Sequence, residues 1–580
     1  MKFRILINLC MLFVALHTNA ADVFFASHTG GNWSQGDLYD KDAYTTASGD
    51  WSSMNAISSS MPQAGDNLYI FSYATTGTDG NGKSIIALAG EVVTYPLEPF
   101  TVNNFTVDVS SSSTQTLRAA YSAPANPTPF ALTVADTMTV ASANSTLVIK
   151  GSSNASNNTF SLLDVGRLNI TGKELSIENN VEEVRIGVSK SGSVYSAKAG
   201  SAGTNDTKFT MGFSLDSAVP LNVYMGNYAN KGTITVYGGT LNVVGETTNT
   251  GLIVLDGTRT GGDMKSLGSG KIINSDGTKG GTITFSGSAI TDTLTIINTN
   301  GDQAGIINFS GATIAETAHL SITGGSNNLT SGSILGRVDF TNVSITLNNN
   351  IIKAGSTINV IDSGLFMYNG SALVSGNVNY LRSKFHMEGN AKIASTSVVL
   401  IKDSTTSSIS GGVIEGKLLL DNATLKGIDW NTSNFTIDGG IIELKNSAKL
   451  IMETGSLTIG ANGANFVFDL SSNSFISFAD ESLLLGDIFA TDFTFLNADV
   501  LGANLYRMFV FEDGIAQSSV LALNGVSITF KDGEIDYEGT FSVTGGELFI
   551  GLTIIPEPST VALIMAILGL GFAIIRRKRS

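Results

Sequence analysis

The sequence predicts an all-β protein, most of it a parallel β-helix, which is a solenoid whose turns stack on one another. Short segments of alternating apolar and polar residues recur between glycine and asparagine turns, and 64 of the 580 residues are glycine. Charged residues make up only 14% of the chain, whereas hydrophobic residues reach 42%. No proline lies between Leu221 and Ile555. Proline interrupts backbone pairing within a sheet, so this long gap indicates uninterrupted strand stacking.

Three near copies of one strand pattern indicate the repeat length. Gly232–Gly238, Gly281–Gly287 and Gly305–Gly311 start 49 and 24 residues apart, which predicts a period near 24 residues. Degenerate repeats of this length are typical of stacked solenoids. Further strands are expected in Val338–Leu347, Lys417–Leu420, Gly440–Leu444 and Lys449–Ile459.

One short segment of the body also carries a family resemblance. Gly239–Gly245, followed by Asn249, Thr250 and Gly251, resembles the glycine-threonine-leucine repeats of autotransporter passenger domains. The resemblance implies a β-helix displayed outside the cell.

The first twenty residues have the pattern of a secretory signal peptide. Lys2 and Arg4 precede the apolar run Ile5–Leu16, and small residues up to Ala20 mark a cleavage site. The only cysteine, Cys10, lies in that run. The mature chain is therefore expected to hold neither disulfides nor thiolate metal sites.

The C-terminal end has three consecutive parts. Ile555–Thr560 contains Pro-Glu-Pro-Ser, Val561–Ile575 is mostly apolar, and Arg576–Arg579 is basic. Fifteen helical residues span about 22 Å, less than a hydrocarbon core of about 30 Å, but the terminal cations favour one transmembrane helix with a cytoplasmic tail. The two prolines are expected to keep Pro556–Ser559 extended and accessible.

These three parts in this order resemble the PEP-CTERM sorting domain. The resemblance implies recognition by an exosortase-type sorting protease, with the precursor in the inner membrane and the product at the cell surface or outside a Gram-negative-type cell. Pro556, Glu557, Pro558 and Ser559 would form the sorting motif, and Arg576, Arg577, Lys578 and Arg579 would retain the tail. The alternative is a single-pass anchor with a coincidental Pro-Glu-Pro.

Sequence patterns divide the chain into five expected regions. Residues 1–20 are the signal peptide, 21–100 an N-terminal β-cap, 101–465 the solenoid, 466–553 a C-terminal β-cap or small sandwich, and 554–580 the sorting signal. The N-terminal region holds Trp33 and Trp51 and resembles the cap of secreted β-solenoids; a small separate β-domain is the alternative. Phenylalanines cluster in the C-terminal cap, where core packing is the expected role.

The charged residues argue against several function classes. The net charge is -16. Without the six basic residues at the two ends, 27 basic and 49 acidic residues remain, which gives a net charge of about -22. Nucleic acid is therefore not an expected partner. His28, His319 and His386 are isolated, so no metal or cofactor is expected. His386 and Glu388 form a base–acid pair that is interpreted as a solvated strand edge.

The sequence thus predicts a non-enzymatic structural or adhesive protein of the cell surface or extracellular matrix, with extracellular polysaccharide as an expected contact. The alternative is a surface polysaccharide lyase or hydrolase, because parallel β-helices also support clustered carboxylates on neighbouring turns.

Overall fold

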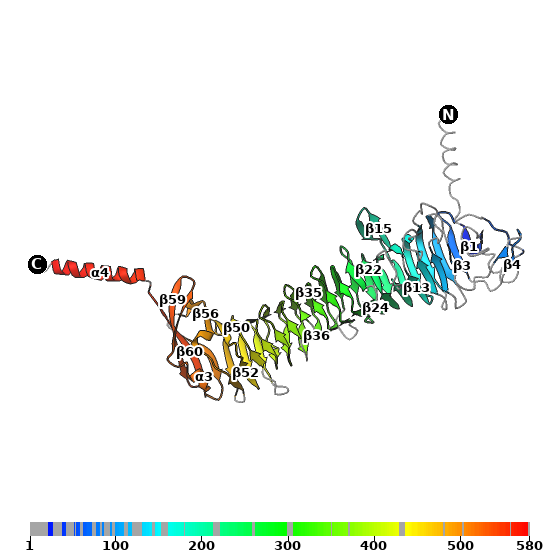
Figure 1. Cartoon of the computed structure of the whole chain (residues 1–580). Coiled ribbons are helices and arrows are strands. Elements are labelled where there is room, and N and C mark those ends of the chain that lie inside the picture. Colours follow the sequence, from blue (N-terminus) through cyan, green and yellow to red (C-terminus); the bar gives the residue numbers. More distant parts are fainter. Residues whose placement is uncertain are drawn as a thin grey trace. The chain divides into compact units, whose positions relative to one another are not determined.

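The computed structural model of the chain (Figure 1) describes residues 21–26, 37–41, 52, 54–57, 62–71, 77–81, 84–85, 93–94, 99–108, 114–118, 130–141, 146–151, 160–178, 180–212, 221–257, 261–298, 305–349, 351–368, 372–428, 435–479, 482–501, 504–556 and 558–577. The predicted signal peptide, His28, Trp33 and Trp51 lie outside these residues. By its internal contacts the chain forms two compact units, Met1–Asn327 and Asn328–Ser580.

The first unit is a stack of parallel strands, as predicted. One ladder contains β1 (Asp22–Ala26), β3 (Asn67–Phe71), β7 (Phe100–Val102), β8 (Asn104–Asp108), β10 (Phe130–Val140), β12 (Phe160–Ile170), β14 (Val181–Ile186), β17 (Gly203–Asn205), β19 (Asn222–Met225), β20 (Tyr228–Asn230), β22 (Gly238–Val243), β23 (Glu246–Asn249), β25 (Gly261–Ser266), β26 (Lys271–Ile273), β29 (Leu294–Ile297) and β32 (His319–Thr323). A second ladder contains β6 (Val93–Thr94), β9 (Thr114–Arg118), β11 (Thr146–Lys150), β13 (Glu174–Ile177), β18 (Lys208–Met211), β21 (Thr233–Val236), β24 (Leu252–Asp256), β27 (Thr282–Ser286) and β30 (Ile306–Ser310). Shorter pairs are β28 (Ala289–Ile290) with β31 (Thr313–Ile314), and β4 (Gly77–Thr78) with β5 (Ser84–Ile85).

The three near-copy segments form β21, β27 and β30, and all three lie in one ladder. β21 pairs with β24, β24 with β27, and β27 with β30, always in parallel. These strands begin at residues 233, 252, 282 and 306, which are 19, 30 and 24 apart. The predicted period is therefore an average, because the loops between strands differ in length while the strands keep their register.

The N-terminal strands belong to the same ladder. β1 pairs antiparallel with β2 (Asp37–Asp40) and parallel with β3, β3 pairs with β8, and β8 pairs with β10. The antiparallel β2 occurs at the start of the ladder, as a cap requires. The N-terminal strands thus continue the ladder of the first unit, and their role as a cap stays a prediction.

A column of buried asparagines runs through the first unit. The side-chain N–H groups of Asn205, Asn230 and Asn249 donate to the side-chain oxygen of the next asparagine, ending at Asn274, at 2.7, 2.7 and 2.6 Å. Each of the three donors also bonds a backbone carbonyl at 3.1 to 3.3 Å. All four side chains are fully buried. The column satisfies its own polar groups inside a core that would otherwise exclude them.

The second unit has three ladders, so that each turn contributes up to three strands. The first contains β35 (Arg337–Thr341), β38 (Thr357–Ile361), β41 (Asn377–Leu381), β44 (Val398–Lys402), β47 (Lys417–Asp421), β50 (Gly440–Lys445), β53 (Ala464–Asp469) and β56 (Phe493–Leu496). The second contains β36 (Ser344–Asn348), β39 (Gly364–Tyr368), β42 (Lys384–Met387), β45 (Ser407–Ile409), β48 (Thr424–Gly427), β51 (Lys449–Met452), β54 (Phe475–Phe478) and β57 (Leu505–Phe511). The third contains β34 (Ser333–Ile334), β37 (Ile351–Ile352), β40 (Leu373–Val374), β43 (Lys392–Ile393), β46 (Val413–Ile414), β49 (Phe435–Ile437), β52 (Ser456–Ile459) and β55 (Leu483–Leu485). Val338–Leu347 and Lys449–Ile459 each hold two strands.

Inward residues in this unit form apolar columns because the strands stay in register. Ile358 pairs with Val378, Val378 with Val399, Val399 with Leu418, and Leu418 with Ile442, and all are buried. Strands alternate buried and half-buried positions, which follows from the two-residue period of side chains along a strand. The core is therefore continuous from turn to turn.

At one corner of the solenoid, five successive coils each contain a residue in the left-handed backbone conformation. Asn342, Asp362, Arg382, Asp403 and Asn422 have φ between +48° and +54°. Each backbone N–H donates to the carbonyl that ends the strand of the next turn, as Asp362 does to Leu381 at 3.1 Å. Asparagine and aspartate tolerate this conformation best. Arg382 is the exception, and its guanidinium bonds both carboxylate oxygens of Asp362.

The parallel ladders continue beyond residue 465, where a cap was predicted to begin. β53, β54 and β56 pair parallel with the strands before them. Among the described strands of the second unit, antiparallel pairing first appears where β57 meets β60 (Glu547–Ile554). β60 also pairs with β59 (Ile535–Thr544), which pairs in turn with β58 (Ser527–Asp532). Short helical segments are η4 (Ala490–Asp492), η5 (Ala498–Val500) and α3 (Ser518–Leu521). Phenylalanine clustering therefore marks the core of the last turns rather than a boundary.

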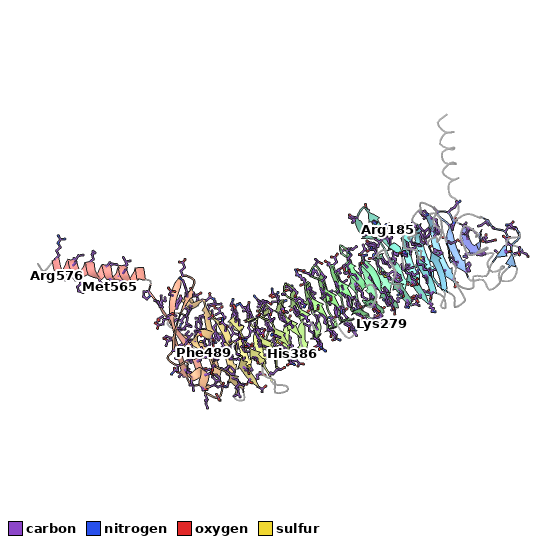
Figure 2. All side chains as sticks on the ribbon, viewed as in Figure 1. Arg185, Lys279, His386, Phe489, Met565 and Arg576 are labelled. Atoms are coloured by element: carbon purple, nitrogen blue, oxygen red, sulfur yellow. The ribbon has the colours of Figure 1, made fainter. Side chains whose placement is uncertain are left out.

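Those phenylalanines pack on one another, as expected. Phe466 and Phe493 have ring centroids 5.8 Å apart, and Phe493 also contacts Phe541 at 5.3 Å. All three are buried. Phe489, labelled in Figure 2, differs, since 61% of it is exposed.

The asparagine column makes a testable prediction for stability. Asn249→Ala removes the side-chain amide that accepts from Asn230 and donates to Asn274, and so leaves a buried donor and a buried acceptor unpaired. The free energy of unfolding is expected to fall by about 1–3 kcal/mol. Asn249→Asp is expected to cost more at neutral pH, because a carboxylate would face the Asn274 oxygen and the Thr282 carbonyl. Urea unfolding measures both, with the half-exposed Asn308→Ala as control. Equal stability of all three variants would show that the column does not stabilise the fold.

Candidate functional site

The predicted sorting motif lies where the last strand ends. β60 ends at Ile554, and Ile555 and Pro556 follow on the surface. Helix α4 (Pro558–Arg577) then begins at Pro558. The prediction that Pro556–Ser559 is extended is therefore wrong for Pro558 and Ser559. Proline is favoured in the first helical turn because the N–H it lacks has no partner there. Glu557 lies outside the described residues.

Helix α4 carries exposed apolar side chains between the motif and the basic residues. Leu563, Ile567, Leu570 and Phe572 are 61 to 73% exposed. Arg576 and Arg577 lie in its last turn, where cations complement the helix dipole. Lys578 and Arg579 are outside the part of the chain that the structure describes. The motif and the first two predicted retention residues thus lie at opposite ends of one helix.

The predicted transmembrane helix is not found. Within the described ranges, no helix combines the length and the apolar character that crossing a membrane requires. The apolar run of fifteen residues corresponds to about 22 Å, shorter than a hydrocarbon core of about 30 Å.

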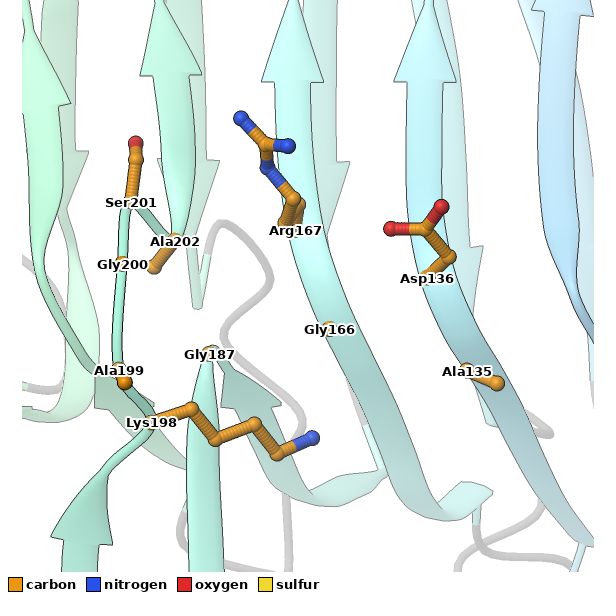
Figure 3. Close-up of a pocket in the computed structure, with 10 residues that line it drawn as sticks. All are labelled: Ala135, Asp136, Gly166, Arg167, Gly187, Lys198, Ala199, Gly200, Ser201 and Ala202. Carbon is orange, nitrogen blue, oxygen red and sulfur yellow. The ribbon is translucent and has the colours of Figure 1, made fainter.

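A polar hollow on the first unit is a second candidate site. It has a volume of about 280 Å³ and is lined by Ala135, Asp136, Gly166, Arg167, Gly187, Lys198, Ala199, Gly200, Ser201 and Ala202. Figure 3 shows Asp136 and Arg167 on neighbouring strands, with the Lys198 side chain extending below Gly187 toward Gly166 in this view. The sequence prediction missed all of these residues.

A β-bulge shapes one wall of the hollow. Val134 pairs with Val165 and Thr137 with Arg167, so Ala135 and Asp136 together face the single residue Gly166. A Cβ on Gly166 would lie 2.5 and 2.6 Å from the carbonyl oxygens of Ala135 and Asp136. Glycine is therefore required here, because only a residue without a side chain lets the bulged strand approach this closely.

Hydrogen bonds from one asparagine hold the opposite wall. Asn227 donates from its side chain to the carbonyls of Lys198 and Gly200 at 3.3 and 3.1 Å. The Ala202 N–H donates to the Asn227 carbonyl at 2.6 Å. The Ser201 hydroxyl accepts from the Gly203 N–H at 3.1 Å. This wall is thus fixed by contacts within the described structure.

A hairpin of β15 (Val188–Ser191) and β16 (Val194–Ala197) leads into that wall and is clamped to the sheet. Tyr195 stacks on Tyr224, with ring centroids 3.7 Å apart and planes 9° apart. Lys190 donates to Glu183 at 2.8 Å, and Arg185 contacts Glu183 and Asp164. Burial raises the pKa of Tyr224 far above its ordinary value.

Glu183 is the centre of this clamp. Burial alone would raise the pKa of Glu183, but hydrogen bonds from Lys190 and Arg185 outweigh this effect and hold the pKa below its ordinary value. The carboxylate is therefore more stable in the folded protein than in the unfolded chain.

His386 is the third candidate, and its interpretation as a solvated strand edge is wrong. The side chain, labelled in Figure 2, is 3% exposed. Its Nδ1 lies 2.7 Å from the hydroxyl of Ser408, and its Nε2 lies 3.3 Å from Glu388. Ser408 is the register partner of His386 on β45, 22 residues away, so the sequence gave no local signal for this contact.

The Ser408–His386–Glu388 group combines a hydroxyl, a base and an acid, which are the parts of an activated nucleophile. Ser408 is 7% exposed, however, and the group lies in a close-packed ladder. Such an arrangement is suited to satisfying buried polar atoms. Among the described residues, no group of three or more histidine, cysteine, aspartate or glutamate side chains is placed to hold a metal ion.

Comparison with known proteins finds a likeness among the solved structures. No family model and no curated protein matches the chain. The crystal structure of the Hap adhesin of Haemophilus influenzae is similar at 12% sequence identity and a TM-score of 0.23, covering 92% of this chain and 71% of that one. The β-helix assignment rests on the strand register described above.

The clamp at Glu183 makes a pH-dependent prediction. Because its pKa is lower in the folded state, Glu183 stabilises the hairpin above about pH 4.5 and loses this effect as the pH falls through the folded value. Glu183→Gln should therefore lower the free energy of opening the hairpin at pH 7 by about 1 kcal/mol. Amide exchange in β15 and β16 should then be roughly fivefold faster. The difference between the two proteins should shrink at pH 3.

Hydrogen exchange compared at each pH measures this effect. Glu182→Gln is the matched control, since it removes a carboxylate from the same strand but none of the described ion pairs. A difference between Glu183→Gln and the unaltered protein that persists unchanged at pH 3 would contradict the electrostatic clamp.

The histidine group makes a separate prediction. Ser408→Ala removes the hydroxyl beside Nδ1 and is expected to destabilise the protein by about 1–2 kcal/mol. Thermal unfolding measures this loss. Hydrolysis of a simple aryl ester should be the same in both proteins. A folded Ser408→Ala protein that loses an esterase activity of the unaltered protein would instead assign Ser408 as a nucleophile.

Proposed function

We propose that the protein is exported and sorted through its C-terminal segment to the cell surface or the surrounding matrix of a Gram-negative-type cell. The observation that carries this proposal is helix α4, whose apolar side chains are exposed between a Pro-Glu-Pro-Ser motif and a basic end. An apolar surface of this kind requires an apolar partner. In this proposal that partner before processing is the inner membrane, whose anionic surface also attracts the basic end of the helix.

The processing partner in this proposal is an exosortase-type protease. Ile555 and Pro556 are exposed between β60 and α4, which supports access to the chain at the motif. A protease needs an accessible backbone that no sheet holds, and the last strand ends at Ile554.

The role of the solenoid in this proposal is structural or adhesive, with extracellular polysaccharide as the contact. Rows of polar side chains on successive turns support it. Asn379 donates to Asn359 at 2.9 Å, and Asn359 donates to Asp339 at 2.6 Å. Successive strands lie about 4.8 Å apart, so these rows present polar groups at regular intervals to a hydroxyl-rich polymer.

Binding rather than catalysis is the role that the described residues favour. The runner-up, a polysaccharide lyase or hydrolase, needs carboxylates free to act as acid and base. Asp164 and Glu183 lie on neighbouring strands, but both contact Arg185. His386 is buried against Ser408.

A doubly tagged protein tests the sorting proposal. One tag is inserted after Gly277, in an exposed turn, and the other follows Ser580. Fractionation of the producing cell should show the internal tag at the surface or outside and the C-terminal tag removed. Glu557→Gln should leave both tags together in the inner membrane fraction, because the sorting motif has lost its only charge.

The matched control is Glu538→Gln, which removes an exposed carboxylate from β59 in the same unit. It should be processed like the unaltered protein. If the unaltered protein keeps both tags, or if Glu557→Gln is processed normally, sorting through this motif is wrong.

A further inference from the structure

The lining of the hollow on the first unit excludes an apolar ligand. Six of its ten residues are glycine or alanine, and the other four are Asp136, Arg167, Lys198 and Ser201. Sites for apolar molecules are lined mainly by large hydrophobic and aromatic side chains, and this lining contains none. Its volume of about 280 Å³ lies at the small end of the range for ligand pockets. The ligand that fits is therefore small and polar.

The charges of the hollow favour a ligand with one negative group. Arg167 makes no ion pair with any described residue, and Lys198 lies 3.9 Å from Asp164, at the limit of an ion pair. These two cations flank the glycine floor, with Asp136 as the single lining carboxylate. The net charge of the chain is -16, but salt screens charges beyond about 8 Å. The local cations therefore decide whether an anion is attracted to the hollow.

The walls of the hollow are held in place without a ligand. The bulge between Val134 and Thr137 fixes the direction of Asp136, and Arg167 follows directly after Gly166 on β12. Asn227 holds the Lys198–Gly200 backbone from the other side. A site whose groups are already positioned loses little conformational entropy when the ligand binds.

We propose that this hollow binds an acidic sugar residue of a polysaccharide. Arg167 or Lys198, at the two ends of the hollow, binds the sugar carboxylate. Asp136 accepts hydrogen bonds from ring hydroxyls, and the Ser201 hydroxyl accepts or donates them. The small residues let the ring approach the backbone. The inference rests on the proposed function only in that export brings the hollow into contact with polysaccharide.

Substitution of Asp136 distinguishes sugar binding from simple attraction of anions to the hollow. If the hollow only attracted anions, removing the negative charge of Asp136 would strengthen binding. If Asp136 accepts hydrogen bonds from sugar hydroxyls, its loss leaves those hydroxyls unpaired and weakens binding. The two mechanisms therefore predict opposite signs for one substitution.

The test measures binding of trigalacturonate to the purified full-length protein by calorimetry, with neutral galactotriose as the matched sugar. Trigalacturonate should bind, and galactotriose should bind at least tenfold more weakly. The double substitution Arg167→Gln and Lys198→Gln should reduce trigalacturonate affinity at least tenfold, and Asp136→Ala, which removes both the charge and the acceptor oxygens, should also reduce it. Lys279→Gln, which alters an exposed turn lysine outside the hollow, should leave affinity unchanged.

Three outcomes would overturn the proposal. They are equal affinity for the acidic and neutral sugars, stronger binding by Asp136→Ala, and inorganic phosphate competing as well as the sugar. Circular dichroism and the unfolding midpoint of each variant show that it is folded. Because the purified protein is used, failed binding leaves the sorting result unaffected, and failed sorting leaves the binding result unaffected.

Discussion

Parallel, in-register pairing between successive turns is the constraint on which the rest of the structure depends. Once β27 pairs with β30 residue by residue, every inward position lies above an inward position of the next turn. The apolar columns, the asparagine column and the left-handed corners are all consequences of this stacking. A shift of one residue would move each buried side chain to the surface, so the register is strongly specified by the hydrophobic pattern.

The sequence allowed prediction of the features that repeat along the chain. The near copies at Gly232, Gly281 and Gly305 identified strands of one ladder, and the strand predicted at Lys417–Leu420 matches β47. The turn lengths were not predictable, since 19, 30 and 24 residues separate strands that occupy equivalent positions. Loop length adds little to the free energy of a stack, so the sequence can vary there without changing the fold.

The polar hollow and the contact of His386 with Ser408 were missed because each depends on residues distant in sequence. Ser408 meets His386 only through the pairing of β42 with β45. The sequence does not distinguish Gly166 from other glycines, because only the folded bulge of β10 places two carbonyls against it. Even α4 shows this limit, because proline was expected to exclude a helix at Pro558, where it instead forms the first turn. Local patterns thus predict elements, whereas sites arise where the ladder departs from regularity.

The hairpin β15–β16 illustrates how such a departure remains compatible with the stack. It leaves the turn after β14 at Gly187, a residue with φ of +61°, and the chain re-enters the ladder at Gly203. The strands on either side keep their partners, since β14 still pairs with β19 and β17 with β20. The far end of the chain follows the same logic. Every sheet contact of β60 is complete by Ile554, and the Ile555 N–H makes a last bond to Asp536. Removal of the chain beyond Pro556 would therefore leave every described ladder intact, so an exported solenoid can lose its sorting segment without losing its fold.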